Sequence, residues 1–396
     1  MPGTRWQLEL VNKIHEMGHR VAIVDPHPDA PCVGKADAYL KSDIFDRSSV
    51  VEFCRRERVG AVLSDECDIV MKEIAAIGKE FNLPTLSLDA AVLYTDKFRM
   101  RERCAKIGIA HPEYRLCSNV DDAIDFLKVL GCPMVLKPLD SNASHGVFTV
   151  KTVDDIRSRF GESMSFSRTG RAVLAERYIE GTEFTIDGIK TPHGHHTLAI
   201  SEKRHFKHND NIANELFFTH RNDRFDYCLL QATNDEFVVD SGLDFGLTHA
   251  EYKFADGKFY QIEIAARGGG NMISSTITRF MSGHDAYRHL IDYALGQAHE
   301  KDFSIPTTFL ERAAVLKFFS TPQGGGKVAK IHGLDVLADE PAVIQHGINF
   351  KPGDVIGDAI SDSARIGFYI ACSRTKDELI SVMNRIENAF GVEYEE

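Results

Sequence analysis

Residues 249–271 (HAEYKFADGKFYQIEIAARGGGN) constrain the fold more than any other stretch of this sequence. Two short runs of aromatic and aliphatic residues flank Asp256-Gly257, which is a strong signal for a β-hairpin. A hairpin that turns there would bring Glu251 and Glu263 close together. Two neighbouring carboxylates repel each other unless a cation lies between them, so the pair is a candidate divalent-metal site. A surface hairpin with solvated acids is the alternative interpretation.

The residues that follow this hairpin are suited to ligand binding. Arg267 provides a cation that can pair with a carboxylate or a phosphate. The three glycines at 268–270 leave a backbone that a ligand can approach closely.

Length and composition favour a multidomain globular enzyme. A chain of 396 residues is expected to form two to four domains, and 43% hydrophobic with 26% charged residues is ordinary for a soluble protein. No window approaches the roughly 20 apolar residues of a membrane span, and residues 1–20 lack the apolar core of a signal peptide. The eight cysteines are scattered without a CxxC pair, so we expect reduced thiols and a cytoplasmic location. The net charge of −12 argues against nucleic acid as a partner.

Residues 1 to about 95 alternate helical and strand patterns, which predicts a parallel α/β architecture. We expect helices at 6–17, 48–57 and 69–81 and strands at 20–25, 60–64 and 84–88. Such folds usually open on a strand and a glycine turn, whereas this chain opens at Pro2-Gly3, so we expect that a first strand is missing from this sequence. Asp25 has the position of a ribose-binding acid, but only Gly3 of the glycine motif is present, so a polar residue at a sheet edge is favoured.

A basic helix is predicted at 96–108, with Asp96 as its N-cap. A run of cations in a helix usually forms a solvent-exposed face, and this is the ordinary explanation here. The five cations are Lys97, Arg99, Arg101, Arg103 and Lys106. The pattern breaks at 109–112, where we place a domain boundary near residue 110.

The next region has an α+β pattern, with a strand at 114–117, a helix at 120–130 and a strand at 133–137. That strand ends at Lys137, which can reach phosphate oxygens, and the small residues of the loop 140–146 offer backbone N–H groups to the same phosphates. The loop is no Walker P-loop, because GxxxxGK[ST] is absent. Residues 173–186 predict two strands, joined at Glu180-Gly181.

Histidines are enriched at 193–196, 205 and 208, but their spacing fits no zinc pattern, so we interpret them as solvated. The charged stretch 200–214 is predicted to be a mobile substrate loop. A helix pair is expected at 275–296, and short strands with a helix at 376–390 are expected in the last region.

The order of these pieces resembles the ATP-grasp ligase superfamily over essentially the whole chain. The matching segments are DKFRMRERCAKIGI, PMVLKPLDSNASHGV, LAERYIEGTEFTIDG and HAEYKFADGKFYQIEIAARGGG. The resemblance implies an α/β and α+β multidomain protein with the ATP-grasp fold. It divides the chain into an N-terminal parallel α/β (pre-ATP-grasp) domain at 1–110, a small subdomain at 111–200, a large subdomain with the metal site at 201–300, and a small mostly-β subdomain at 301–396. The Ala265-Ala266-Arg267 run with its three glycines is most similar to the L-amino-acid ligase (dipeptide synthetase) branch.

The resemblance also implies a nucleotide site. Lys97 and Lys137 would neutralise the phosphates of ATP, and Glu183 would bind the ribose. The phosphate-covering loop would include Ser141, Ser144, His145 and Gly146, and the adenine hinge would be formed by Glu176 and the backbone of Tyr178 and Ile179.

By the same resemblance, Glu251 and Glu263 would hold Mg²⁺, with Mn²⁺ as an alternative. Arg267 would steady the reacting carboxylate and its acyl phosphate, so Arg267 and Lys137 are the candidate catalytic residues. Many members have an asparagine two residues after the second metal acid. Here that position is Ala265, which leaves the number of bound ions open.

The expected function is that of an ATP-dependent carboxylate–amine ligase that forms an amide or a dipeptide together with ADP and phosphate. Its partners would be a small-molecule carboxylate and an amine, without nucleic acid or membrane, and a homodimer is the commonest oligomeric state. His205 and His208 are candidates for the base that deprotonates the amine. The alternatives are a carboxylase of the biotin or purine-pathway type, and a nucleotide-binding module without turnover.

Overall fold

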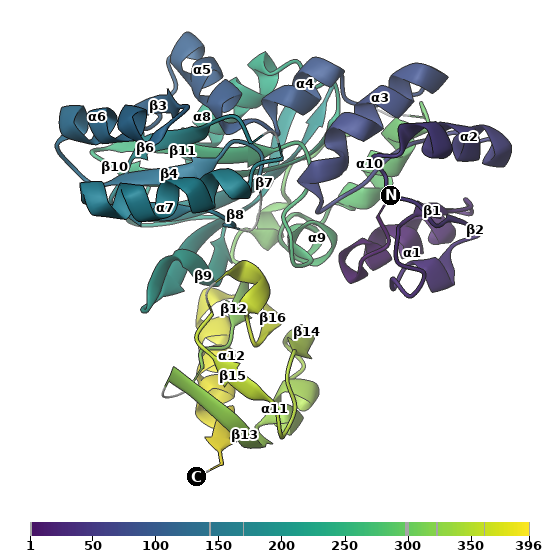
Figure 1. The fold of residues 1–396 in the computed structure, drawn as a ribbon. Coiled ribbons are helices and arrows are strands. Elements are labelled where there is room, and N and C mark those ends of the chain that lie inside the picture. The colour runs from purple at the N-terminus through teal and green to yellow at the C-terminus, as the bar shows by residue number, and fades with distance from the viewer. Residues whose placement is uncertain are drawn as a thin grey trace.

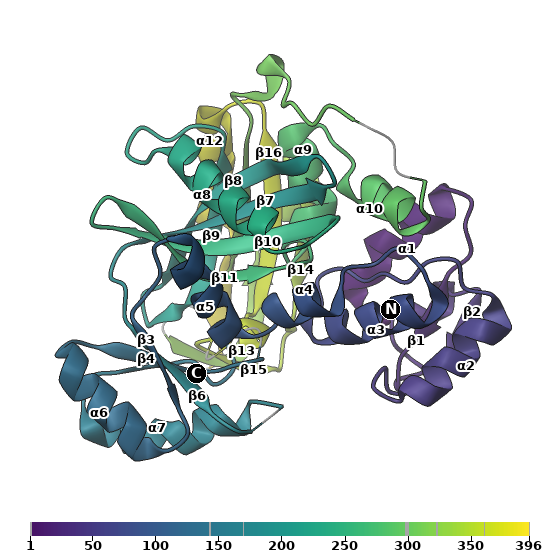
Figure 2. The ribbon, with the colours of Figure 1, turned by 90° about the horizontal axis from the view of Figure 1, so that it is seen from above.

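The structure is a computed structural model that describes residues 2–141, 144–168, 170–297, 301–321, 324–359 and 361–395. Within these ranges the chain forms four β-sheets with helices packed around them (Figure 1). The view from above shows the N-terminal region and a small sheet on different sides of one large sheet (Figure 2). None of the described helices has both the length and the apolarity needed to cross a bilayer.

The N-terminal region is parallel α/β, as predicted. β1 (Ala22–Val24) pairs in parallel with β2 (Ala38–Leu40). The predicted helices correspond to α1 (Leu8–Glu16), α2 (Arg47–Glu57) and α3 (Met71–Phe81), and the predicted strand at 20–25 corresponds to β1. Asp25 accepts hydrogen bonds from the backbone N–H groups of Gly3 and His27, at 2.8 and 2.9 Å, which agrees with a structural role for this acid.

Two predicted strands of this region are wrong. Residues 60–64 form no strand, because no neighbouring strand in the described ranges pairs with them. Residues 84–88 lead instead into α4 (Leu88–Leu93), because the Ser87 side chain accepts a hydrogen bond from the N–H of Ala90 and caps the helix.

A small antiparallel sheet follows, and its elements confirm the predicted ones. Its strands lie in the order β3 (Tyr114–Cys117), β6 (Val173–Arg177), β4 (Met134–Pro138) and β5 (Phe148–Val150). The helices α6 (Val120–Leu130) and α7 (Val153–Ser165) pack on it and share its apolar core. The side chain of Asn119 caps the start of α6, and Gly131, with φ of 63°, ends it.

The large sheet has eight strands. In spatial order they are β11 (Lys258–Ala265), β10 (Gly246–Ala255), β7 (Thr182–Thr191), β8 (Gly194–Phe206), β9 (Asn209–Thr219), β12 (Ala313–Phe318), β16 (Gly367–Ser373) and β14 (Val343–Ile348). The prediction of a mobile loop at 200–214 is wrong, because these residues form the paired hairpin of β8 and β9. The charges that suggested a loop lie in strands whose hydrogen bonds come from pairing with each other.

Helices cover both faces of the large sheet. α5 (Lys97–Ile107) and α8 (Tyr227–Asp240) pack on one face, and the turn η4 (Ile273–Ile277) with α9 (Thr278–Ser282) packs on the other. Successive residues of β8 therefore enter different cores: Ile200 packs with α5 and α8, and Ala199 packs with η4 and α9. α9 and α10 (Ala286–Ala294) confirm the predicted helix pair.

The C-terminal region adds a separate three-stranded sheet in the order β15 (Val355–Gly357), β13 (Gly325–His332) and β17 (Gly391–Tyr394). α12 (Lys376–Ala389) packs on β12 and β16 of the large sheet, α11 (Leu334–Asp339) contacts β14, and α12 confirms the predicted last helix. The large sheet runs through the predicted domain limits at 200 and 300, since residue 200 lies inside β8. The four-domain division stays a prediction.

The hairpin at 249–271 forms as predicted. β10 and β11 are antiparallel, and Glu251 stands directly opposite Glu263. The turn residues Asp256 and Gly257 have φ of 49° and 75°, which is the left-handed conformation that a tight hairpin turn requires. β11 lies at the edge of the sheet, beside α5.

Candidate active site

A cleft of about 120 Å³, open to solvent, lies between the small sheet and the large sheet. The cleft brings together most of the predicted site residues from distant parts of the chain: Lys97, Lys137, Ser141, Ser144, Glu176, Tyr178, Ile179, Glu183, Glu251 and Glu263.

Lys137 is buried at the floor of this cleft and pairs with Glu176. Lys137 Nζ lies 2.7 Å from one carboxylate oxygen of Glu176, and Arg101 Nε lies 2.7 Å from the other. Burial would raise the pKa of Glu176, but the two cations outweigh it and hold the pKa below its usual range. Burial lowers the pKa of Lys137, and the positive charge of Arg101 adds to this effect. This buried triad links α5 to both inner strands of the small sheet.

Arg101 corrects the interpretation of the basic helix as a solvated face. Its side chain is fully buried and also donates to Gln261 Oε1, at 2.8 Å, and to the carbonyl of Ile262. Lys97, one turn earlier, is buried as well, whereas Arg99 lies at the surface. Only part of the helix therefore faces solvent.

The two acids of the hairpin are each paired with a lysine. Lys97 Nζ lies 2.8 Å from Glu263 Oε1 and donates to the carbonyl of Ser141 at 2.7 Å. Lys203 Nζ lies 2.9 Å from Glu251 Oε1 and 2.6 Å from Glu183 Oε1. These lysines neutralise the carboxylates that the hairpin brings together.

Glu183 is surrounded by cations. Besides Lys203, His205 Nε2 lies 3.3 Å and Lys253 Nζ lies 3.9 Å from its second oxygen. Burial would raise the pKa of Glu183, but these groups hold it well below its usual range. His205 is thus a cleft residue, and the prediction that the histidines are solvated is wrong for it. The prediction is also wrong for the buried His195, which contacts Asp235 and Thr248.

The predicted phosphate loop reaches the cleft with only some of its residues. Ser141 and Ser144 line it, and the Ser144 hydroxyl donates to the carbonyl of Asn211 in β9 at 3.3 Å. His145 instead stacks on Phe166, with ring centroids 5.9 Å apart, and Gly146 is not among the described lining residues. Positions 142 and 143 of this loop lie outside the described residues.

A second hollow of about 260 Å³ continues the cleft toward the N-terminal region. Lys97, Ser141 and Glu263 line both spaces, so the two spaces adjoin. Asp68 lines the far side of the second hollow. Arg168 also lines it, and its guanidinium lies 3.6 Å from the ring centre of Phe45.

Arg267 is fixed by this N-terminal wall. Its Nε and Nη2 donate to the two oxygens of Asp68 at 3.0 and 2.9 Å, and its Nη1 donates to the carbonyl of Gly268 at 2.9 Å. A guanidinium has five N–H groups, so Arg267 keeps donors that no described partner occupies. Asp68 thus orients Arg267, and some N–H groups of Arg267 have no hydrogen-bond partner among the described residues.

The glycine run is fixed by buried acids on both sides. Asp65 accepts from the N–H of Gly268 at 2.6 Å, and Asp187 accepts from the N–H of Gly269 at 3.1 Å. His249 Nδ1 lies 2.9 Å from the same oxygen of Asp187. Within the described ranges, the second oxygen of Asp187 and one oxygen of Glu66 have no hydrogen-bond partner. Burial, followed by the charge of Asp65, raises the pKa of Glu66 well above its usual value.

The described residues contain no group of three or more His, Cys, Asp or Glu side chains suited to a metal. Two carboxylates remain, Glu251 and Glu263. This donor set fits Mg²⁺, which is usually held by one or two carboxylates together with substrate phosphates and water.

Several site residues escaped the sequence analysis, namely Arg101, Lys203, Lys253, Asp68, Asp187 and His249. Lys253 carries a usable signal, because it lies between Tyr252 and Phe254 in the same strand as the predicted Glu251. Asp68 carries none, because it meets Arg267 across 199 residues of sequence.

Family comparisons agree with this arrangement. Residues 130–276 match the family model of the ATP-grasp domain, and residues 318–395 match that of the L-amino acid ligase C-terminal domain 2. Among solved structures, an L-amino acid ligase from Bacillus licheniformis has a TM-score of 0.81 at 19% identity, covering 98% of this chain and 95% of that one. This structural likeness establishes the fold.

Curated relatives match more distantly. A formate-dependent phosphoribosylglycinamide formyltransferase from Ignicoccus hospitalis is 24% identical over 174 residues, which is 43% of each protein. Dapdiamide A synthase from Enterobacter agglomerans is 24% identical over 272 residues, covering 66% of this chain and 62% of that enzyme. The chain thus spans less than two thirds of the length of either relative.

Proposed function

We propose that this chain, in which residues 130–276 match the ATP-grasp domain, is an ATP-dependent carboxylate–amine ligase. It would activate a carboxylate as an acyl phosphate and pass the acyl group to an amine, giving an amide or dipeptide with ADP and phosphate. One observation carries the proposal: Lys97, Lys137, Glu251 and Glu263 line one cleft, although they come from separate elements. The adjoining hollow ends at Asp68, which orients Arg267.

The cleft between the sheets is the proposed nucleotide site. Lys97 and Lys137 neutralise phosphate oxygens, and Glu183 binds the ribose. Ser141, Ser144, His145 and Gly146 form the covering loop, of which Ser141 and Ser144 line the cleft. The segment with Tyr178 and Ile179 connects the small sheet to the large one, so its backbone is well placed as the adenine hinge beside Glu176. These roles rest on the position of the residues and on the family.

Glu251 and Glu263 are the proposed ligands of Mg²⁺, and Mn²⁺ is a second candidate for the same oxygen donors. When bound with the nucleotide, the ion neutralises charge on the phosphates. Lys97 and Lys203 lie beside the two acids and compensate their charges. Ala265 offers no oxygen side chain, and two carboxylates with nucleotide and water suffice for a single ion.

The reaction needs positioning and charge neutralisation more than covalent help. A carboxylate oxygen attacks the γ-phosphorus, the bond to the bridging oxygen breaks, and ADP leaves. The amine nitrogen then attacks the acyl carbon, the bond to the phosphate oxygen breaks, phosphate leaves, and the nitrogen loses a proton. Arg267 would hold the carboxylate beside the glycine run, in which the N–H groups of Gly268 and Gly269 donate to Asp65 and Asp187. Both are oriented by acids, Asp68 and Asp65, that stay out of the transfer.

Amino acids are the first substrates to test. The family model that matches residues 318–395 and one solved neighbour are both named for L-amino acid ligases. The unpartnered oxygens of Asp187 and Glu66, beside the glycine run, also favour a substrate with a cationic group such as an ammonium.

A release assay for ADP and phosphate, run over amino acids singly and in pairs, tests the ligase. Turnover should require both an acid and an amine, and mass spectrometry should show the condensed product. Turnover that depends on bicarbonate would instead assign the carboxylase alternative. Tight ADP binding without turnover over the whole panel would assign the nucleotide-binding module.

A further inference from the structure

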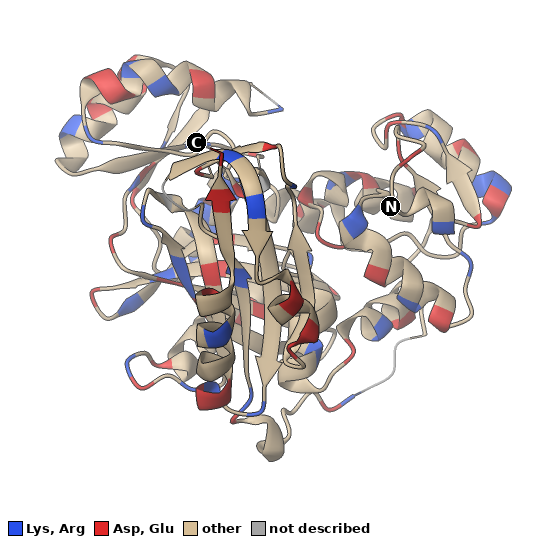
Figure 3. Ribbon diagram, turned by 90° about the horizontal axis from the view of Figure 1, so that it is seen from below, with Lys and Arg blue, Asp and Glu red and all other residues tan. Residues whose placement is uncertain are grey.

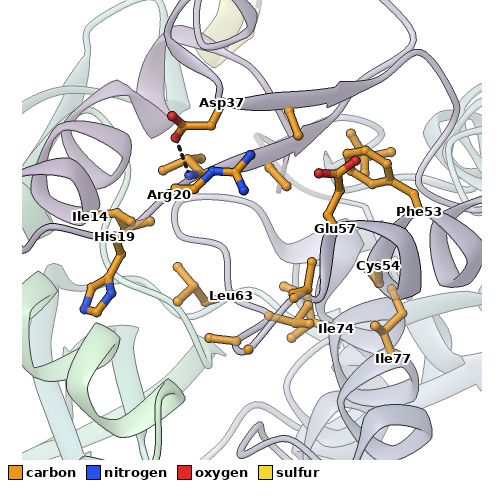
Figure 4. A pocket seen from close by; sticks show the side chains of 18 of the residues that line it. Ile14, His19, Arg20, Asp37, Phe53, Cys54, Glu57, Leu63, Ile74 and Ile77 are labelled. Carbon is orange, nitrogen blue, oxygen red and sulfur yellow. Dashed lines mark hydrogen bonds between the residues drawn. The ribbon is translucent and has the colours of Figure 1, made fainter.

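The hollow that adjoins the cleft is lined mostly by charged and polar side chains. It differs in this from an apolar slot of about 450 Å³ in the N-terminal region, whose walls include Ile14, Leu63 and Ile74 (Figure 4). The hollow takes its walls from the N-terminal region and from the region of the small sheet, and both regions carry basic and acidic segments (Figure 3). Because one water molecule needs roughly 10–15 Å³ of such a volume, the hollow of about 260 Å³ has room for a small polar ligand.

The acids among the described lining residues of this hollow each have a partner. Three of them form ion pairs: Asp68 with Arg267, Glu73 with Arg47, and Glu263 with Lys97. The fourth, Asp140, accepts from the Ser167 hydroxyl at 2.8 Å and from the backbone N–H of Arg168 at 3.2 Å. Three of the four negative charges are thus offset by cations, and the fourth is bonded to the segment 167–168.

Two cations of the hollow have no acid partner. Lys72 belongs to α3 in the N-terminal region, and Arg168 belongs to the segment that follows α7 on the small sheet. Across the part of the chain that the structure describes, neither of these side chains forms an ion pair or a side-chain hydrogen bond. Two positive charges on different walls of one small hollow attract an anion to the space between them.

Arg168 is already oriented to receive such an anion. Its guanidinium centre lies 3.6 Å from the ring centre of Phe45, which also lines the hollow. A guanidinium that stacks on an aromatic face keeps its N–H edge available, and it loses less conformational freedom when it binds. That edge matches the two oxygens of a carboxylate, which it can bind through two parallel hydrogen bonds.

The hollow lies next to the proposed reacting groups. It shares Lys97, Ser141 and Glu263 with the nucleotide cleft, and Asp68 on its wall orients Arg267. The amine that attacks an acyl phosphate held by Arg267 has to approach from a space beside these groups. A molecule whose anionic end lies between Lys72 and Arg168 is bound in such a space.

We propose that the hollow binds the carboxylate of the amine-bearing substrate through Arg168 and Lys72. This inference rests on the proposed ligase function and narrows it, because the amine is then an amino acid and not a simple amine. Arg267 holds the carboxylate that is activated, and Arg168 holds the carboxylate that is left unchanged. The two arginines thereby assign the two acids to different roles.

The test compares amines that differ only in this carboxylate. With ATP and the acid partner saturating, the amine is offered as an L-amino acid or as its amide, and the mixed product is quantified by mass spectrometry. The wild type should favour the amino acid. Arg168→Gln should raise the KM for the amino acid by roughly tenfold or more and leave kcat and the KM for the amide nearly unchanged. Lys72→Gln should change the same KM in the same direction.

Arg159→Gln is the matched control. Arg159 in α7 is another stacked arginine, 4.9 Å from the ring centre of Phe148, and it is half exposed and does not line the hollow. This variant should keep the wild-type preference for the amino acid. Equal use of amino acid and amide by the wild type would overturn the proposal, although the ligase would stand. A rise in the KM for ATP alone in Arg168→Gln would assign the cations to a phosphate group and would also overturn it.

Calorimetry tests the hollow without turnover. L-amino acids and their amides are titrated into the protein together with ADP and Mg²⁺. We expect the amino acids to bind more tightly than their amides, and we expect Arg168→Gln, but not Arg159→Gln, to remove this difference. Such binding without turnover of any pair would support the hollow as a carboxylate site and overturn the ligase. Binding that does not depend on the carboxylate, or that Arg168→Gln leaves intact, would overturn the site.

Discussion

The Lys97 ammonium lies 2.8 Å from Oε1 of Glu263, so a predicted phosphate-binding cation and a predicted metal-binding acid neutralise each other. Lys203 does the same for Glu251 at 2.9 Å. Two carboxylates that face each other across a hairpin would repel if they stood alone. The positive charges of the two lysines offset this repulsion. Both lysines can turn to phosphate oxygens when a nucleotide binds together with a divalent ion.

Replacing Glu263 by glutamine should abolish most turnover without unfolding the protein. The amide keeps the shape of the side chain but loses the charge that binds the metal and Lys97. We expect ADP formation to fall by roughly 100-fold or more. The matched control is Glu80→Gln, which removes a surface carboxylate paired with Arg55 at 2.6 Å and should leave activity unchanged. Equal ADP formation by the Glu263 variant and the wild type would contradict the metal assignment.

Variants of the buried triad of Arg101, Glu176 and Lys137 should distinguish effects on stability from effects on nucleotide binding. Glu176→Gln leaves the cations of Arg101 and Lys137 buried without a counter-charge, which should cost about 3–5 kcal/mol in the free energy of unfolding. Lys137→Met keeps the Arg101–Glu176 pair, so its loss of stability should be smaller, while the Kd for ADP should rise by about tenfold or more. Urea unfolding and calorimetry measure the two quantities. A larger destabilisation by Lys137→Met than by Glu176→Gln would contradict this division.

Substitution of Gly269 by alanine should disturb the glycine run, and the same substitution at the neighbouring Gly270 is the control. A Cβ at Gly269 would lie 2.5 Å from Asp187 Oδ1 and 2.9 Å from His249 Nδ1, whereas at Gly270 the nearest atom is Glu66 Oε2 at 4.0 Å. Gly269→Ala should therefore lower stability by about 1–3 kcal/mol and impair turnover. Gly270→Ala should change stability by no more than about 0.5 kcal/mol. Thermal unfolding and the phosphate-release assay compare the two variants, and equal behaviour would count against a closely fitted run.

His289 should make the fold sensitive to acid. Burial lowers the pKa of His289 from 6.5 to about 4, and its ring contacts Phe303 with centroids 4.8 Å apart. Between these two pKa values the unfolded chain binds more protons than the folded one. The contribution of His289 is thus present above pH 6.5 and is lost as the pH falls toward about 4.

The variant His289→Phe should lose less stability than the wild type between pH 7.5 and pH 5. Urea midpoints at the two pH values measure this difference. His27→Phe, at an exposed position, is the control and should follow the wild type. The same pH dependence in all three proteins would exclude His289 as its source.

Features fixed by neighbouring residues could be predicted from the sequence. The hairpin of β10 and β11 depends on an Asp-Gly turn between two strand-like runs. The helix at 120–130 depends on a capping residue at each end. The order of these segments was enough to indicate the superfamily and most of the cleft residues. Lys137 was found because a cation at a strand end, next to a small-residue loop, is itself a signal of phosphate binding, whereas Lys97 was indicated by the family resemblance alone.

Features fixed by tertiary contacts could not be predicted. Arg101 looks like one more cation of a basic helix, and only the fold brings Glu176 to it across 75 residues. The stretch 200–214 looks irregular in the sequence because its charged side chains line a cleft. The other wall of this cleft is formed by residues that are distant in the sequence. Residues 60–64 have the composition of a strand, but a strand needs a partner, and none is described beside them.

Asp65 and Asp68, both from the N-terminal region, orient Gly268 and Arg267, whereas the lysines of the nucleotide cleft are held by residues of other elements. Substitutions in the short segment around these aspartates would alter which acid is accepted and leave the use of ATP intact. Evolution can therefore change the product of such an enzyme without changing the residues that bind ATP. A directed-evolution library confined to residues 65–72 is the corresponding route to new amides.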